Sequence, residues 1–161
     1  MFRRMKVQEF ERGLLFRDGR FVRSLDPGVH WVRGELRLVD VRRRDTMVDV
    51  GPVLTRDLVP IGVRLKISYR VREPEKALLQ AFEFRTQLVN DATAAVHRAL
   101  TPLPMAELAA EHNRLEETIQ DRLAIEVVSY GLRVEDVAIL QVRFPRALRR
   151  KLKRMEVGAL P

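Results

Sequence analysis

Residues 61–71 read IGVRLKISYRV, and this stretch decides the fold class. Its apolar residues occupy every second position from end to end, and Arg64, Lys66 and Arg70 lie between them. A period of two places alternate side chains on opposite faces of a strand. One face therefore belongs to a core and the other presents a basic row, as in an antiparallel sheet with one solvated face.

The residues before this strand predict a series of shorter strands. Apolar residues at 14–16 and 21–22 flank Asp18-Gly19, which is a strong hairpin signal because glycine tolerates the positive φ of a primed turn. A second turn is predicted at 26–28, where Asp-Pro-Gly leads into another apolar stretch. The first third of the chain is therefore predicted to be β.

Two further strands are predicted from apolar runs. Residues 36–50 indicate one long strand, with a bulge where the apolar phase slips between Leu38 and Val39. Residues 134–144 indicate the last strand, and the unbroken apolar run at 137–140 favours a central position in the sheet.

Two helices are predicted between these last strands. Pro74 suits the first position of a helix, and Thr-Pro-Leu-Pro at 101–104 ends that helix. A second helix begins near Pro104 and ends at Tyr130-Gly131, because glycine commonly follows a helix C-terminus. The apolar stripes of the two helices consist of Phe84, Leu88, Ala92, Ala95, Val96 and Ala99, and of Leu108, His112, Leu115, Ile119 and Leu123.

The order of elements predicts an α+β fold, with a largely antiparallel curved sheet, a helix pair packed on it and a basic C-terminal helix. Residues 1–145 are expected to form one domain, and residues 146–161 a basic helix where an oligomerisation segment begins. A stripe at i, i+4 and i+7 ringed by cations suits a partner helix or an anionic surface. The candidate oligomerisation residues are Leu148, Arg149, Arg150, Leu152 and Met155.

Charge is distributed unevenly along the 161 residues. Residues 1–72 carry a net charge of +8, residues 73–145 a net charge of −5, and the remaining residues a net charge of +5. Basic ends around an acidic middle suit like molecules that pack against one another, as well as a polyanion.

The chain lacks the residue patterns of an enzyme or a metal site. It has no cysteine, which excludes disulfides and thiol chemistry, and His30, His97 and His112 lack the paired spacing of a zinc helix. No P-loop, dinucleotide fingerprint or nucleophile elbow occurs. Glu107, Glu111, Glu116 and Glu117 are interpreted as the solvated side of a helix. We therefore predict no catalytic residues, no cofactor and no metal.

The basic residues leave two interpretations open. The row of Arg64, Lys66 and Arg70 could bind anions or nucleic acid, but aromatic residues make up only 6% of the chain and stacking aromatics are usual in single-strand binders. No apolar run of membrane-spanning length is present, and the basic start leads into no apolar run, so it is not a signal peptide. Arg3, Arg4 and Lys6 are the candidate contacts with an anionic membrane surface.

Six phrases in order resemble the SPFH (stomatin/prohibitin/band-seven) domain family, and prokaryotic stomatin-like slipins in particular. They read ERGLLFRDGRFV at 11–22, PGVH at 27–30, LTRD at 54–57, YRVREPEKAL at 69–78, YGLRV at 130–134 and FPRAL at 144–148. The resemblance covers nearly the whole chain.

The resemblance implies a non-enzymatic, self-associating scaffold domain on the cytoplasmic face of a membrane. Such proteins form homo-oligomers and organise lipids, channels or membrane proteases, so the expected partners are further copies of the chain, anionic lipid, and a membrane protease or channel. The alternative is an anion- or nucleic-acid-binding module that uses the basic sheet face. Family members usually carry an N-terminal apolar anchor and a long coiled coil, so we expect this chain to be an excised core or a short member.

Overall fold

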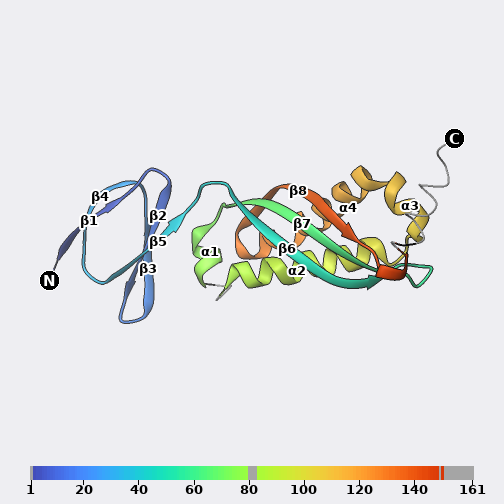
Figure 1. The fold of residues 1–161 in the computed structure, drawn as a ribbon. Helices are drawn as coiled ribbons and strands as arrows, with labels where there is room; N and C mark the ends of the chain where they lie inside the picture. Colours follow the sequence, from blue (N-terminus) through green and yellow to red (C-terminus); the bar gives the residue numbers. More distant parts are fainter. Residues whose placement is uncertain (1, 80–82, 149, 151–161) are drawn as a thin grey trace.

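A computed structural model describes residues 2–79, 83–148 and 150 and has the predicted α+β fold. The molecule is elongated (Figure 1). A small unit built from the first five strands lies at one end, and a larger unit of a three-stranded sheet with helices occupies the rest.

The predicted hairpin is confirmed in the small unit. Strands β2 (Glu11–Arg17) and β3 (Arg20–Leu25) pair antiparallel around a two-residue turn. Asp18 has φ 49° and Gly19 has φ 74°, which are the left-handed values that a type I′ turn requires. Strand β5 (Glu35–Asp40) completes a three-stranded sheet of order β3-β2-β5.

Two further strands form a separate ribbon beside this sheet. Strand β1 (Arg3–Val7) pairs antiparallel with β4 (Gly28–Val32), which follows the predicted second turn. Strand β1 was not among the strands predicted from the sequence. The ribbon packs on the sheet through a small apolar core whose fully buried members are Val7, Leu15, Leu25 and Val32.

Strand β2 joins the two units because it is buried on both faces. Leu15 faces the small core, whereas Leu14 and Phe16 belong to the large core of the molecule. The hydroxyl of Ser24 on β3 donates a hydrogen bond to Glu75 on helix α1 (Pro74–Leu79). Both contacts fix the small unit against the larger one.

The second sheet contains the strand that decided the fold class. Strands β6 (Arg44–Leu54), β7 (Pro60–Val71) and β8 (Leu132–Arg143) pair antiparallel in the order β6-β7-β8. Every apolar residue of the alternating stretch is buried, as predicted: Ile61, Val63, Leu65, Ile67, Tyr69 and Val71.

The predicted central position of the last strand is wrong, because β8 lies at an edge. Its apolar side chains are explained by α4 (His112–Val127), which packs along β8. Glu116 of α4 also accepts a hydrogen bond from the backbone N–H of Ile139 at 2.6 Å. Glu116 is therefore not on the solvated side of its helix, as the sequence suggested, but satisfies an edge-strand donor.

The single long strand predicted over residues 36–50 is also wrong. The chain leaves the first sheet after Asp40 and enters the second at Arg44, and the β2–β5 pairing has no register shift at Leu38 and Val39. The apolar phase changes because the chain changes sheet. The crossing is fixed by Asp40, whose carboxylate accepts hydrogen bonds from Arg42 and Arg44 at 2.6 and 2.8 Å. The bond from Arg42 holds the pKa of Asp40 well below its ordinary value.

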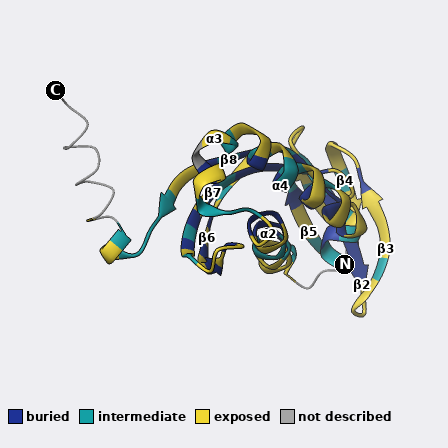
Figure 2. Ribbon diagram, turned by 90° about the vertical axis from the view of Figure 1, so that its right-hand side faces the viewer, coloured by how far each residue is buried: buried dark blue, intermediate teal, exposed yellow. Residues whose placement is uncertain are grey.

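Helix α2 (Phe84–Leu100) lies on the concave side of the second sheet, which curves over it in Figure 2. Helix α4 runs beside α2, so the predicted helix pair is present. Each predicted helix is divided, however. Helix α1 contacts β2, and α2 begins only after Glu83, whose backbone is not helical. Helix α3 (Met105–Ala110) is separated from α4 by Glu111.

The predicted helix stop at Gly131 is confirmed. The helix ends in a 3₁₀ turn (Val128–Tyr130), and Gly131 follows with φ 77°. A Cβ atom at Gly131 would lie 2.4 Å from the carbonyl oxygen of Glu73, so only glycine fits. The Tyr130 hydroxyl donates to Asp91 on α2 at 2.7 Å, and burial raises the pKa of Tyr130.

Candidate membrane-contact face

The outward face of the β1–β4 ribbon gathers cations and exposed apolar side chains. Residues directly opposite each other in an antiparallel pair project from the same face. Arg4 lies opposite Trp31, and Lys6 lies opposite Val29. We call these four residues the ribbon face.

The apolar members of the ribbon face are open to solvent. Trp31 is 66% exposed and Val29 is 49% exposed, although both residue types are usually buried. Phe2, just before β1, is 62% exposed. Large apolar side chains gathered on one exposed face are typical of an interaction site.

The other face of the ribbon fixes this orientation. Val7 and Val32 are fully buried in the small core, and Met5 packs against them. His30 Nε2 lies 2.7 Å from the carbonyl oxygen of Asp26, which ties the β4 side chain to the turn before it. A register slip that buried Trp31 would expose this core, so the ribbon face is strongly specified.

The structure divides the predicted membrane-contact residues between the two faces. Arg4 and Lys6 lie together on the ribbon face, whereas Arg3 lies opposite Val32 and so on the other face. Within the described residues, neither Arg4 nor Lys6 makes an ion pair. Both cations are therefore available to an external anion.

This arrangement has the chemistry of a membrane–water interface. Tryptophan is enriched there because its ring is apolar and its N–H is polar. Lysine and arginine side chains beside it can bury their stems while their charges reach anionic headgroups. Trp31 and Val29 were not among the candidate residues predicted from the sequence. They could have been found by pairing the predicted strand at 29–32 with a strand at 3–7, because alternate residues of the two strands then share one face.

Two of the three cations in the basic row on β7 are paired with carboxylates of the flanking strands, whereas Lys66 has no ion-pair partner within the described residues. Arg64 donates to Asp49 on β6 at 2.9 and 3.0 Å, and Arg143 on β8 reaches the same carboxylate at 3.0 Å. Arg70 donates to Glu135 on β8 at 2.9 Å. The hydrogen bond from Arg64 lowers the pKa of Asp49. Paired cations cost more to recruit to phosphates, which argues against the anion- or nucleic-acid-binding alternative.

The predicted oligomerisation residues are only partly described. The chain is helical at Arg146–Leu148 and at Arg150, which agrees with a helix that follows Pro145. Leu148 is half-buried and Arg150 is exposed. Arg149, Leu152 and Met155 lie outside the described residues.

The three histidines lie on separate elements. His30 is on β4, His97 is exposed on α2, and His112 begins α4 with its Nε2 atom 3.5 Å from Glu116. In the part of the chain that the structure describes, no cluster of histidine and acidic side chains could hold a metal ion. None of the helices in that part is long and apolar enough to cross a membrane.

Comparison with known proteins gives one family and several relatives. The model of the SPFH domain / Band 7 family matches residues 5–157. An uncharacterised protein of Archaeoglobus fulgidus is 29% identical over 147 residues, which cover 89% of this chain and 59% of that protein. A stomatin homolog of Pyrococcus horikoshii is 26% identical over 151 residues, which cover 92% of this chain and 57% of that protein. Protein HflK of Vibrio cholerae is 27% identical over 150 residues, which cover 89% of this chain and 38% of that protein. The chain thus spans less than two thirds of the length of these relatives.

Proposed function

Because this chain belongs to the SPFH domain / Band 7 family, we propose that it is a non-enzymatic, self-associating scaffold domain that binds the cytoplasmic surface of a membrane and organises proteins or lipids there. The observation that carries this proposal is the ribbon face, where Trp31 is exposed beside two cations that have no ion-pair partner among the described residues. The proposed partners are anionic lipid, further copies of the chain, and a membrane protease or channel as client.

The energetics favour a reversible, peripheral contact. Each cation near an anionic surface is worth about 1 kcal/mol, and burying a large apolar side chain contributes about 1.5–3 kcal/mol. The ribbon face therefore supplies a few kcal/mol for one copy. Several copies held together would multiply this contact without any new interaction, which is why self-association belongs to the proposal.

Sedimentation with vesicles tests the membrane part of the proposal. We expect the chain to pellet with vesicles of a neutral phosphatidylcholine that contain an anionic lipid such as phosphatidylserine, and to remain in solution with neutral vesicles. Added salt should release it, since exposed charges are screened within about 10 Å at 0.1 M ionic strength. Equal binding to neutral and anionic vesicles would count against the proposal.

Truncation tests the proposed role of the C-terminal segment. The last strand ends at Arg143, so a chain that stops after Arg146 keeps every strand and helix of the two cores. We expect this truncation to leave the melting temperature nearly unchanged and to weaken self-association in sedimentation velocity. Unfolding of the truncated chain, or undiminished association, would overturn the assignment of Leu148, Arg149, Arg150, Leu152 and Met155 to assembly.

A further inference from the structure

The tip of the β6–β7 hairpin carries a leucine in an unfavourable conformation. Leu58 has φ 59°, in the left-handed region that glycine and asparagine enter far more easily than leucine. Its side chain is also 74% exposed, so the fold gains little apolar burial from it. A strained residue whose side chain does not serve the monomer points to a contact outside it.

The tip holds Leu58 rigidly. Buried Thr55 accepts a hydrogen bond from the N–H of Val59 at 3.1 Å, and its hydroxyl donates to Asp57 at 2.6 Å. The same Asp57 oxygen accepts from the N–H of Met105, the first residue of α3, at 3.1 Å. The N–H of Leu58 donates to the Thr55 carbonyl oxygen at 2.9 Å. Because these hydrogen bonds already order the turn, little further backbone entropy is lost when a partner covers the Leu58 side chain.

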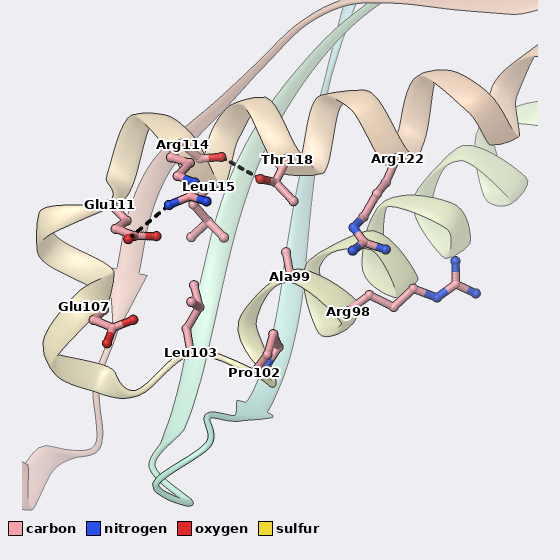
Figure 3. Close-up of a pocket in the computed structure, with 10 residues that line it drawn as sticks. All are labelled: Arg98, Ala99, Pro102, Leu103, Glu107, Glu111, Arg114, Leu115, Thr118 and Arg122. Carbon is pink, nitrogen blue, oxygen red and sulfur yellow. Dashed lines mark hydrogen bonds and ion pairs between the residues drawn. The ribbon is translucent and has the colours of Figure 1, made fainter.

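A pocket of about 310 Å³ lies beside this tip, between the end of α2, α3 and α4 (Figure 3). Its apolar lining includes Ala99, Leu103 and Leu115. The carbonyl oxygen of Leu103 accepts a hydrogen bond from the N–H of Arg56 at 2.9 Å, so the tip and the pocket share one surface. A cavity of roughly 150 Å³ is enough for a benzene molecule, so this pocket has room for a leucine side chain.

The pocket is lined by charges of both signs, namely Glu107 and Glu111, and Arg98, Arg114 and Arg122. Arg98 is paired with Glu126 and Arg114 with Glu111, so both of these arginines already have a counter-ion. Arg56 at the tip is exposed, and Glu107 at the pocket is exposed; neither side chain has a hydrogen-bond or ion-pair partner within the described residues. An Arg56 that approaches a Glu107 from another molecule would therefore form a new ion pair without breaking an existing one.

We infer that this surface is a two-fold contact between copies of the chain, in which Leu58 of each copy enters the pocket of the other and Arg56 pairs with Glu107. When a protruding side chain such as Leu58 and the pocket that receives it lie side by side on one surface, that surface is self-complementary. Self-complementarity is the requirement for a two-fold interface. The inference rests on the self-association proposed above and names a contact other than the C-terminal segment.

The substitution Leu58→Asn separates this role from a structural one. Asparagine relieves the left-handed strain, so the melting temperature should stay the same or rise. The dissociation constant of the self-associated form should rise at least about 30-fold, since a two-fold dimer loses two anchors and each loss costs on the order of 1 kcal/mol or more. Sedimentation velocity over a concentration series measures the second quantity.

Cysteine cross-linking tests the geometry directly, because the native chain has no cysteine. A mixture of the Leu58→Cys chain and a chain with Thr118→Cys, which lines the pocket, should give a disulfide-linked dimer on mild oxidation. A mixture of Leu58→Cys with Ser129→Cys, which is exposed in the 3₁₀ turn that follows α4, is the matched control and should give little cross-linked dimer. A disulfide requires Cα atoms within about 7 Å, so random collision is a poor substitute for a docked interface.

The outcomes separate this inference from the proposed function. A chain that stays monomeric at every concentration overturns both. A chain that associates, and is weakened by C-terminal truncation but not by Leu58→Asn or by the charge reversal Arg56→Glu, overturns the two-fold contact alone. The double variant Arg56→Glu with Glu107→Arg exchanges the two charges. If it restores the association that Arg56→Glu alone had weakened, the ion pair across the interface is established.

Discussion

Two rows of cations lie on exposed strand faces of this molecule, and their surroundings differ. On β7, Arg64 and Arg70 are bonded to carboxylates that the flanking strands supply, and only Lys66 of that row lacks an ion-pair partner within the described residues. On the β1–β4 ribbon, Arg4 and Lys6 lie beside Trp31 and Val29, and no carboxylate of the described residues is paired with either cation.

The comparison shows that cation count alone does not identify a binding surface. A cation that has an internal counter-ion contributes to solubility and, weakly, to stability. A cation beside an exposed aromatic ring is different, because the cation can bind a charged group of a partner while the ring contacts an apolar part of the same partner. We therefore expect the ribbon face to control membrane binding and the β7 face to contribute only to the fold.

The largest expected effect is that of Trp31→Ala on binding to anionic vesicles. Removing the indole should cost about 2 kcal/mol of binding free energy, or roughly 30-fold in affinity, because its buried area at the interface is lost. The free energy of unfolding should change by less than about 0.5 kcal/mol, as for other exposed positions. Vesicle sedimentation and a thermal melt of the same protein measure both quantities, and a large drop in the melting temperature would assign Trp31 to the fold instead.

The next effect is that of Arg4→Gln or Lys6→Gln. Each should weaken binding to anionic vesicles by about 1 kcal/mol at low salt, and the difference from the native chain should shrink as salt is added. Arg3→Gln is the internal control, because Arg3 lies on the other face of the ribbon and should have the smaller effect. If all three substitutions weaken binding equally, the contact depends on the net charge of the N-terminal residues and not on the ribbon face.

A smaller effect is expected when a paired arginine on β7 is replaced. Arg70→Gln should leave vesicle binding unchanged and lower the free energy of unfolding by about 0.2–1 kcal/mol, the usual range for a partly exposed ion pair. A chemical denaturation curve measures the stability change. Weaker vesicle binding by this variant would mean that the β7 face also meets the membrane.

The smallest effect concerns the pH dependence of stability. The folded-state pKa of Asp49 lies below its unfolded value because Arg64 donates hydrogen bonds to the ionised carboxylate. The resulting stability is present above the ordinary aspartate pKa and is lost as the pH falls through the folded-state value. Arg64→Gln should therefore lower the melting temperature slightly at neutral pH, and the difference from the native chain should narrow below about pH 4. A difference that stays constant down to the lowest pH would assign the effect of Arg64 to packing.

The sequence predicted the elements that short-range rules determine. The alternation at 61–71, the Asp18-Gly19 turn and the glycine after Tyr130 each act within a few residues, and each is confirmed. What failed depended on distant partners. The apolar run at 137–140 suggested a central strand because the sequence does not show that α4 covers that edge.

The candidate site likewise combines features that neighbouring residues determine with features that depend on distant partners. Composition identified the basic N-terminal residues, but only the pairing of β1 with β4 shows that Trp31 accompanies Arg4. Likewise the β7 row is recognisable from 61–71 alone, whereas the pairing of its two arginines depends on Asp49 and Glu135, which are distant in sequence. Faces can be predicted from local periodicity, but partners across strands cannot.

The fluorescence of Trp31 tests the central claim most directly, because it is the only tryptophan in the chain. Its emission should shift to shorter wavelength and become protected from an aqueous quencher when anionic vesicles are added, since the indole leaves water for the membrane interface. Neutral vesicles should leave the emission unchanged, and Arg4→Gln together with Lys6→Gln should reduce the shift at low salt. A chain that sediments with anionic vesicles while Trp31 remains fully exposed to the quencher would contradict the assignment of the ribbon face as the membrane contact.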